Sequence, residues 1–403
     1  MAGAGLFLVG MAGERLKWKV VQHFYFDHNA TTNLAPGVIS QLPALLVEAY
    51  GNASSIHYFG QMAKQRLETA RRTIGLKLHC DPRDIVFTGG GTESDNLAIF
   101  GVVRASSALQ KHVITSAIEH PAVLNACGKL EAEGVAVTYL PVGKGGAVEP
   151  EAVRAAICPE TVLITIMHAN NETGVVQPLG KISKIARETG VPLHSDGVQT
   201  AGRIPVDLGA FGLTLYSISG HKLGAPKGVG ALYVKKGTAL EPMFYGGHHE
   251  RDRRAGTENV PGAAAMGWAL AEADWSGTAE LRDRLEQSVL ARVPGCSVNG
   301  AGSARLPNTT NLCFSGVEGE AMVIALDLRG YAVSSGSACS SGAVEPSHVL
   351  LAMGLSREDA RSSVRISLGP ENTREQVDGL IEAVVASEAH LRRLSPELVP
   401  AHA

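Results

Sequence analysis

Short apolar runs alternate with helical patterns between about residue 60 and residue 236 of this 403-residue chain. Seven runs have the composition of strands: residues 85–87, 113–115, 135–142, 162–167, 192–194, 213–218 and 229–234. Helical stretches such as residues 151–157 and 179–189 lie between several of them. This alternation predicts an α/β fold whose mainly parallel sheet is covered by helices. Ligands bind such sheets beyond the carboxyl ends of the strands, so polar residues at those ends are the first candidates for a site.

The pattern changes after about residue 259, where helical segments lead into mixed short strands. Because 403 residues exceed what one small core needs, we expect two domains. We predict a large domain over residues 30–262. We predict a smaller α+β domain over residues 263–403, which also includes residues 25–29. Residues 1–24 carry basic residues after a short apolar patch, the reverse of a secretory signal. We expect them to be a leader outside the fold, with a weak organellar signal as the alternative.

The charge balance and the cysteines disfavour several classes of protein. With 36 basic and 39 acidic residues, the net charge of −3 gives no electrostatic reason to bind nucleic acid or an anionic membrane. No apolar run approaches the roughly 20 residues of a membrane span. The six cysteines are scattered, without CxxC or zinc-ligand spacing, at positions 80, 127, 158, 296, 313 and 339. Free thiols are typical of a reducing compartment, so we predict a cytoplasmic protein without a resident metal.

Lys222 closes the segment Ser-Ile-Ser-Gly-His-Lys at residues 217–222, directly after an apolar run and before several glycines. A lysine at such a strand end loses its proton more easily when it is desolvated. The neutral amine is then a nucleophile that can hold a carbonyl cofactor as a Schiff base. The alternative is a surface lysine after a core strand, and Lys227, in a Pro-Lys-Gly turn, fits that description better.

Residues 88–96, Thr-Gly-Gly-Gly-Thr-Glu-Ser-Asp-Asn, follow a strand and precede an apolar segment. Free backbone N–H groups and the positive end of a helix dipole meet at such a place, which suits a phosphate. Gly91 and Thr92 are the expected contacts. The segment matches neither GxGxxG nor a Walker loop, which disfavours a nucleotide. An ordinary tight turn is the alternative.

Polar residues also follow other predicted strands. Asp196 can pair with a protonated pyridine nitrogen and Gln199 can donate to a phenolic oxygen on the same ring, although Asp196 also suits a helix N-cap. The amides of Asn170 and Asn171 suit recognition of a carboxylate, or an Asx-turn. His120 can stack on a flat ring and exchange protons near neutral pH, or it is a structural histidine.

Two segments rich in glycine or other small residues lie outside these strand ends. Residues 246–259 contain adjacent histidines that face apart, which disfavours zinc, whereas their arginines and Thr257 can reach a phosphate across a subunit interface. Residues 333–342 are nearly all small and carry Cys339. Ten loose residues, folded out and back, can move a tip by roughly 17 Å at about 3.4 Å per residue. A reactive thiol there needs a local positive field, and the alternative is an inert thiol on a surface loop.

Together these motifs resemble the cysteine desulfurases of the NifS/IscS type, which are pyridoxal 5'-phosphate (PLP) enzymes of fold type I in the class V aminotransferase group. The resemblance covers about residues 25 to 385. It rests on His221-Lys222, Asp196 with Gln199, residues 91–96, Asn170-Asn171-Glu172, the opening residues 25–32, residues 246–259 and the cysteine segment at 334–339. Residues 253–259 and 345–348 look closer to the nitrogen-fixation branch than to the housekeeping branch.

The resemblance implies a role for each candidate residue. Lys222 would bind PLP covalently and later move protons, Cys339 would be the nucleophile, and His120 would stack on the ring as a catalytic residue. The implied cofactor contacts are Lys222, Gly91, Thr92, Asp196, Gln199, Ser219, His221 and, from the partner subunit, Thr257. The implied ligands of the substrate carboxylate are Asn171 and Arg365. No resident metal is implied, apart from a transient iron–sulfur contact at Cys339.

The activity that the resemblance implies is conversion of L-cysteine to L-alanine, with a persulfide on Cys339 that donates sulfur to iron–sulfur clusters or other sulfur-containing cofactors. A homodimer and a sulfur-acceptor or iron–sulfur scaffold protein are the implied partners. Selenocysteine lyase and a PLP transaminase without sulfur transfer are the alternatives among enzymes. A non-catalytic sulfur-relay or assembly protein is a third reading, and the presence of Lys222 argues against it.

Overall fold

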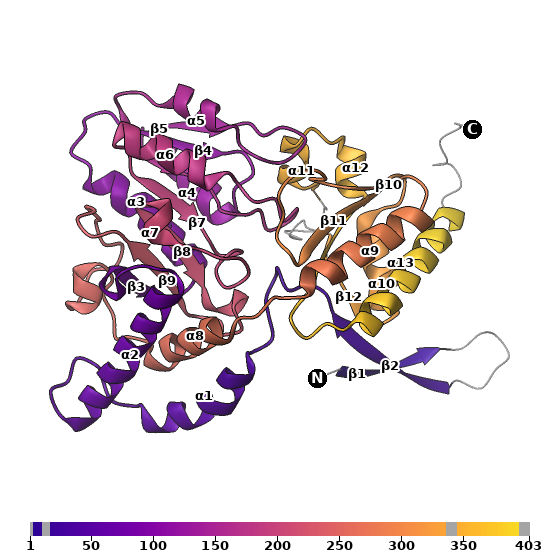
Figure 1. Ribbon diagram of the computed structural model, residues 1–403, viewed down its shortest axis with the longest axis horizontal. Coiled ribbons are helices and arrows are strands. Elements are labelled where there is room, and N and C mark those ends of the chain that lie inside the picture. The colour runs from indigo at the N-terminus through magenta and orange to yellow at the C-terminus, as the bar shows by residue number, and fades with distance from the viewer. Residues whose placement is uncertain (1–2, 10–16, 336–344, 395–403) are drawn as a thin grey trace. The chain divides into compact units, whose positions relative to one another are not determined.

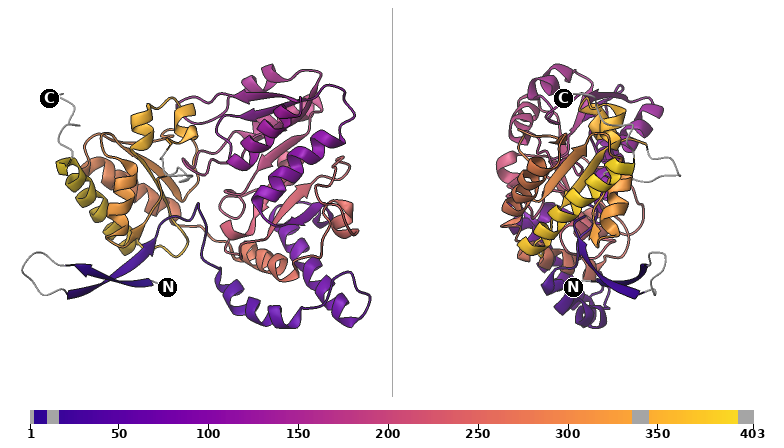
Figure 2. Two further views of the ribbon diagram at one scale, coloured as in Figure 1. Left: turned by 180° about the vertical axis from the view of Figure 1, so that it is seen from behind. Right: turned by 90° about the vertical axis from the view of Figure 1, so that its right-hand side faces the viewer.

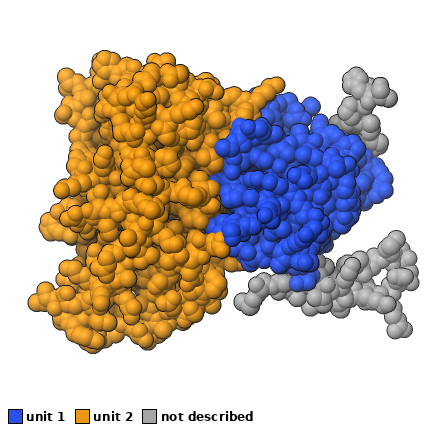
Figure 3. Space-filling model, in the orientation of Figure 1, with its two compact units in different colours: residues 1–29, 172–174, 275–403 blue, residues 30–171, 175–274 orange. Residues whose placement is uncertain are grey.

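The computed structural model describes residues 3–9, 17–335 and 345–394, with side chains from residue 22 onward. The chain divides into two units, which Figure 3 draws in different colours. The large unit comprises residues 30–171 and 175–274, and the small unit comprises the described parts of residues 1–29, 172–174 and 275–403. The boundary after residue 274 lies later than the expected one at 262. The reason is that helix α8 (Val260–Glu272) buries its apolar side chains and packs on helix α2 (Tyr58–Lys77) of the large unit.

Seven strands form the sheet of the large unit, in the order β3-β9-β8-β7-β6-β4-β5. Every neighbouring pair except those that involve β9 is parallel, which confirms the predicted sheet. The strands are β3 (Ile85–Thr88), β4 (His112–Ser116), β5 (Ala136–Leu140), β6 (Thr161–Thr165), β7 (Leu193–Asp196), β8 (Leu215–Ser219) and β9 (Gly230–Val234). All except β5 and β6 are buried along their whole length, and for this reason strands such as β3 and β9 appear as continuous apolar runs.

Helices cover both faces of this sheet (Figures 1 and 2). The helices of the large unit are α1 (Pro36–Glu48), which packs on α8, and α2 (Tyr58–Lys77), α3 (Gly91–Ala105), α4 (Pro121–Ala132), α5 (Pro150–Ala156), α6 (Leu179–Thr189), α7 (Leu208–Phe211) and α8, with the 3-10 turns η1 (Pro82–Asp84), η2 (Gly220–Lys222) and η3 (His249–Asp252). In α6 the apolar side chains of Ile182 and Ile185 recur at helical spacing and are buried. Gly190 then ends α6 in the left-handed conformation, with φ of 73°.

The small unit combines two three-stranded sheets with helices, an α+β arrangement. Its strands are β10 (Cys296–Val298), β11 (Thr309–Phe314) and β13 (Ser363–Ser367), which are antiparallel, and β1 (Gly3–Val9), β2 (Lys17–Tyr25) and β12 (Tyr331–Ala332). Its helices are α9 (Thr278–Arg292), α10 (Gly319–Asp327), α11 (His348–Ala352), α12 (Arg357–Arg361) and α13 (Arg374–Leu394). Phe26, Leu312 and Phe314 lie in its apolar core. Among the helices described, none has both the length and the apolar sequence that crossing a membrane requires.

The structure differs from the expectation that residues 1–24 lie outside the fold. Strands β1 and β2 form an antiparallel hairpin in which Gly3 pairs with His23 and Val9 with Lys17. β2 also pairs in parallel with β12 of the small unit. The physical reason is that Phe26 is fully buried, and the backbone N–H groups of Phe24 and Phe26 donate to the carbonyls of residues 330 and 332. Because β2 is held at its carboxyl end by β12, the rest of β2 can pair with the preceding residues of β1.

Candidate active site

The predicted site residues of the large unit lie at one edge of its sheet. Gly91 follows β3, His120 follows β4, Asn171 follows β6, Asp196 ends β7 and Ser219 ends β8. These strands are parallel to one another, so their carboxyl ends share one edge, where ligands of such sheets bind. The fold therefore brings together residues that are up to 128 positions apart in the chain (219 minus 91).

The glycine segment after β3 has the geometry of an anion cradle. Gly90 adopts φ of 155° and ψ of −176°, a conformation open only to glycine. A Cβ atom at Gly91 would lie 2.8 Å from Cγ2 of Val198 and 3.4 Å from Cβ of Ser219, so no larger residue fits without movement. The 15-residue helix α3 begins at Gly91 and directs its first backbone N–H groups to this place. The segment therefore fits a phosphate group.

An ion pair between Glu93 and Arg254 fixes the backbone of the glycine segment. One carboxylate oxygen of Glu93 accepts from the backbone N–H of Gly89 at 2.7 Å, and the other accepts from Nε of Arg254 at 2.8 Å. Arg254 belongs to the glycine-rich segment at residues 246–259, so this segment is tied to the start of α3. The predicted phosphate ligand Thr257 is exposed in the chain as it stands, as a residue contributed to a partner subunit would be.

Lys222 lies on the single turn η2, directly after the buried strand β8. Its Nζ donates to the carbonyl oxygen of Ala30 at 2.6 Å. Both the backbone N–H and the hydroxyl of Thr32 donate to the carbonyl of His221, at 3.0 and 2.9 Å. Residues 30–32 thus fix the backbone that carries the lysine, and the side chain is half-buried rather than solvated.

The ring of His221 is neutral at physiological pH. Burial lowers the pKa of His221 to about 4, and the positive charges of Lys222, Lys227 and Arg203 add to this effect. Its Nδ1 lies 3.1 Å from the hydroxyl of Thr31. A neutral histidine still offers one N–H donor to an anion, which agrees with its predicted role at the phosphate.

Asp196 is the buried carboxyl group at the centre of the site. One of its oxygens accepts from the backbone N–H of Val198 at 2.9 Å, so the carboxyl does form a local turn as well. Burial raises the pKa of Asp196, and the nearby charges of His120 and Lys222 oppose that rise. A buried carboxylate needs a cationic partner, and a protonated pyridine nitrogen would supply one. His120 and Lys222, expected from separate motifs, therefore both act on Asp196.

Two further buried carboxyl groups lie near Asp196, and the sequence did not single them out. Burial raises the pKa of Glu119 to about 8, and the charge of Asp196 adds to the rise. Glu119 accepts from the hydroxyl of Ser116 at 2.6 Å and from the backbone N–H of Met167 at 2.9 Å. Asp95 also has a raised pKa, because of burial and then the charge of Asp196. Burial is a tertiary property, so no local pattern could have marked these carboxyl groups.

His120 is the N-cap of α4, and its orientation follows from that position. Its Nδ1 accepts from the backbone N–H of Ala122 at 3.1 Å, so a neutral ring carries its proton on Nε2. A cavity of about 550 Å³ opens beside His120 and Thr92 and continues between α3 and α4. That volume suits a small organic ligand.

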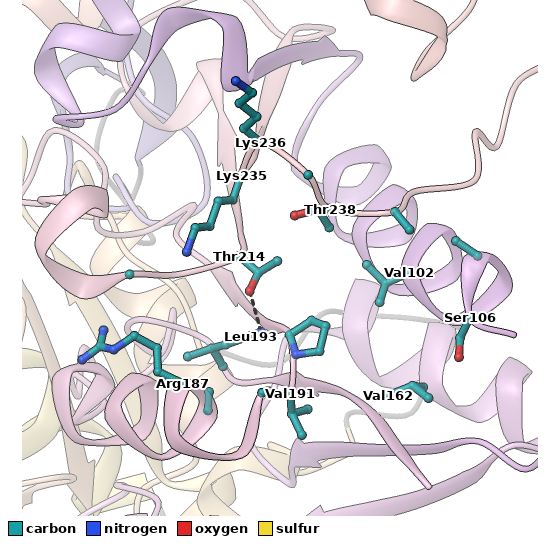
Figure 4. Close-up of a pocket in the computed structure, with 17 residues that line it drawn as sticks. Val102, Ser106, Val162, Arg187, Val191, Leu193, Thr214, Lys235, Lys236 and Thr238 are labelled. Atoms are coloured by element: carbon teal, nitrogen blue, oxygen red, sulfur yellow. Dashed lines mark hydrogen bonds between the residues drawn. The ribbon is translucent and has the colours of Figure 1, made fainter. Parts of the chain in front are cut away.

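Another cavity, of about 630 Å³, lies at the opposite edge of the sheet and contains none of the predicted residues (Figure 4). Leu193 and Thr214, at or just before the starts of β7 and β8, line it, and a hydrogen bond of 3.1 Å joins them. Lys235 and Arg187 line one side of it in Figure 4, and Val102 another. Because it lies at the amino ends of the parallel strands, it is not the expected ligand site of this sheet.

The small unit holds the predicted carboxylate ligand Arg365 on β13. Its side chain is buried, and Nη2 donates to Asp27 at 2.6 Å. The backbone of Arg365 pairs with that of Ser334, with N–H to O distances of 2.7 and 3.1 Å. Cys339 lies outside the described residues. After that segment, the hydroxyl of Ser347 donates to the buried carboxyl of Glu172 at 2.5 Å.

The remaining part of the glycine-rich segment is structural. Glu250, Arg251 and Asp252 all have positive φ, of 45°, 58° and 65°. The carboxylate of Glu250 is buried, pairs with Arg71 and accepts from the backbone N–H of Phe87 at 3.0 Å. Within the described residues, no group of three histidine, cysteine or acidic side chains is placed to hold a metal.

Comparisons with known proteins identify the family of this chain. The model of the family "Aminotransferase class-V" matches residues 24–380. The chain is 46% identical over 378 residues to a protein of Nostoc sp. named "Cysteine desulfurase", covering 92% of this chain and 94% of that one. It is 44% identical over 378 residues to "Cysteine desulfurase IscS" of Methanosarcina thermophila, covering 92% and 93%.

Solved structures show the same likeness. A structure titled "NifS-like protein" matches with a TM-score of 0.86 and 33% identity, covering 92% of this chain and all of that one. Another, titled "SspA in complex with cysteine", matches with a TM-score of 0.79 and 36% identity, covering 87% and 99%. With the family model matched over nearly the whole chain, this protein belongs to the class-V aminotransferase family and, within it, to the cysteine desulfurases.

Proposed function

We propose that this protein is a PLP-dependent cysteine desulfurase that converts L-cysteine to L-alanine and holds the sulfur as a persulfide on Cys339. The observation that carries the proposal is the position of Lys222: it lies at the carboxyl edge of the sheet, next to the buried carboxyl of Asp196. The identity of 46% to a named cysteine desulfurase supports the same activity.

The residues of the large unit fit PLP. Gly91, Thr92, Ser219 and His221 would hold its phosphate, together with Thr257 of the partner subunit. Asp196 would pair with the ring nitrogen, Gln199 would donate to the phenolic oxygen, and His120 would stack on the ring. When bound, PLP withdraws electrons from the α-carbon of the amino acid. The glycine cradle, which a Cβ atom at Gly91 would fill, supports this fit.

The chain's own groups would move the protons and the sulfur. The amine of Lys222 takes the proton from the α-carbon of cysteine, and Asn171 and Arg365 bind the substrate carboxylate. The thiolate of Cys339 attacks Sγ of the substrate: an S–S bond forms, the Cβ–Sγ bond breaks, and its electron pair stays on the carbon, which is then protonated to give alanine. Overall, cysteine and the enzyme thiol give alanine and an enzyme persulfide, so no external oxidant is needed.

The test uses the purified full-length chain with L-cysteine and a reductant. We expect sulfide and alanine in equal amounts. Cys339→Ser should keep the visible absorption of bound cofactor and lose sulfide release, whereas Cys158→Ser, a half-buried thiol that precedes β6, should keep turnover. Amino transfer that depends on an added keto acid, without sulfide, would instead favour the transaminase. Efficient release of selenide from selenocysteine, with little sulfide from cysteine, would favour the lyase.

We propose further that the active form is a homodimer. The large unit exposes a group of apolar side chains around the start of α2, namely Tyr50, Ile56, Tyr58 and Phe59, which are 70%, 94%, 70% and 48% exposed. A patch of this kind is typical of an interface. A molecular mass of twice the chain in light scattering would support the proposal, and a monomer that retains full activity would contradict it.

The persulfide needs an acceptor and a reducing compartment. We propose a sulfur-acceptor or iron–sulfur scaffold protein as the partner, because a persulfide must pass its sulfur on before reductants release it as sulfide. We propose the cytoplasm as the location, because free thiols are typical of a reducing compartment. Sulfur from labelled cysteine should then appear on a scaffold protein only when Cys339 is present.

A further inference from the structure

Arg203 lies directly beside the candidate site, although no motif of the sequence contains it. It follows β7 in the turn that Asp196 begins, and it is only 5% exposed. Its Nη1 donates to Oε1 of Gln199 at 2.6 Å. Its Nη2 lies 3.5 Å from the carbonyl oxygen of Lys222. One guanidinium group therefore contacts two of the residues that would hold the cofactor.

The chemistry of this contact fixes how the amide of Gln199 is turned. An arginine side chain has donors and no acceptor, so the oxygen end of the amide must face it. The orientation of most glutamine amides is ambiguous, but here the partner decides it. With Oε1 held by Arg203, Nε2 is the end of Gln199 that can donate to an oxygen atom of a ligand.

We propose that Arg203 is a positioning residue of the cofactor site, which presents Nε2 of Gln199 as a donor to the phenolic oxygen of PLP. This rests on the proposed function, because it presumes that PLP binds. Arg203 also lowers the pKa of His221 through its charge, which agrees with its position next to the site. A lysine ammonium is a single point of charge, so it cannot contact both Oε1 of Gln199 and the carbonyl oxygen of Lys222 as the planar guanidinium of Arg203 does.

The test is a titration of the full-length apoprotein with PLP, followed by its visible absorption. The variants are Arg203→Met, Arg203→Lys, Gln199→Ala and the double variant Arg203→Met/Gln199→Ala. The control is Lys235→Met, which removes an exposed charge at the opposite edge of the sheet from Gln199. Thermal unfolding of each apoprotein shows whether it is folded.

The expected result is a dissociation constant about tenfold higher for Arg203→Met and for Arg203→Lys, the size of one lost hydrogen bond at the ligand. Gln199→Ala should have a similar effect, and the double variant should bind no more than about twofold more weakly than Gln199→Ala alone, because Arg203 acts through Gln199. The absorption band of bound PLP should shift in the same direction in all these variants. Lys235→Met should bind like the unchanged protein.

Two results would overturn the inference while leaving the proposed function intact: unchanged affinity in the Arg203 variants, or effects of Arg203→Met and Gln199→Ala that multiply in the double variant. If Arg203→Met does not fold, Arg203→Lys and the double variant Arg203→Lys/Gln199→Ala take its place. Effects on PLP affinity that multiply in that double variant would again overturn the inference. If the unchanged protein takes up no PLP, the proposed function itself fails, and the inference fails with it.

Discussion

Arg71 and Glu250 are joined by two hydrogen bonds inside the large unit, 2.8 Å from Nη1 to Oε2 and 2.7 Å from Nη2 to Oε1. Both side chains are almost fully buried, at 3% and 2% exposure. Glu250 begins the three residues with positive φ, a conformation that costs about 1–3 kcal/mol for each residue without compensation. The pair therefore anchors a strained turn that precedes Arg254 and Thr257.

We predict that Glu250→Gln lowers the free energy of unfolding by about 3–5 kcal/mol, because it removes the buried carboxylate that pairs with Arg71 and leaves only the partly exposed Glu68. Chemical denaturation of the apoprotein measures this. Glu68→Gln is the matched control: Glu68 also pairs with Arg71, at 3.1 Å, but is 37% exposed, so the loss should stay below about 1 kcal/mol. Equal losses in the two variants would mean that burial does not decide the strength of this pair.

The pKa of Glu119 gives a prediction about pH. Folding raises this pKa from 4.5 to about 8, so between these values the folded state binds more protons than the unfolded state. Its contribution to stability is therefore present at low pH and is lost as pH rises from about 4.5 to 8. In the apoprotein, Glu119→Gln should make the fall of stability with pH shallower by up to about 1.4 kcal/mol per pH unit. Glu149→Gln, at an exposed position, is the control and should leave the pH dependence of stability unchanged. If Glu119→Gln has the same pH dependence as the unchanged protein and this control, the raised pKa of Glu119 is refuted.

The glycine cradle predicts a selective loss of cofactor binding. In Gly91→Ala the new methyl group would approach Val198 to 2.8 Å, so the start of α3 must shift. We expect the affinity for PLP to fall at least about tenfold while the apoprotein stays folded. Gly180→Ala, in α6, meets no atom within 4 Å and should leave binding unchanged and increase stability by up to about 1 kcal/mol. Titration with PLP and thermal unfolding separate the two effects.

Chemical trapping tests the role of Lys222. Reduction of the loaded protein with borohydride should fix one PLP group to the peptide that contains Lys222, as mass spectrometry of a digest would show. Lys222→Ala should carry no label after the same treatment, because the neighbouring Lys227 is exposed and lies outside the site. A label that moves to Lys227, or that is absent from the unchanged protein, would contradict the assignment.

The strands and the order of elements could be predicted because their signal is local. The run predicted at residues 85–87 became β3 (Ile85–Thr88), and the one at 229–234 became β9 (Gly230–Val234). β9 runs antiparallel to both its neighbours. This direction could not be predicted, because the sequence of one strand does not indicate how it is oriented in the sheet. The place of β2 in the small unit was missed because Phe24 pairs with Tyr331, 307 residues away in the chain (331 minus 24).

The site could be predicted only as far as its residues belong to motifs. Lys222, Asp196 and His120 were predicted because each lies at or soon after the end of a strand, and the fold places Asp196 close enough to the other two for their charges to act on it. Glu119 and Asp95 gave no signal, because a carboxyl group becomes unusual only through burial. Arg203 gave no signal in the sequence either, because its proposed role is to orient the side-chain amide of Gln199.

The small unit is built from three separate stretches of the chain, and this sets an order on its synthesis. The large unit is complete once residue 274 has emerged from the ribosome. Phe26 and the strand that leads to it must wait until Tyr331 has been made. Phe24 to Phe26 are thus translated early and find their partners late, so loss of either these residues or the strand at residue 331 removes part of the same structure.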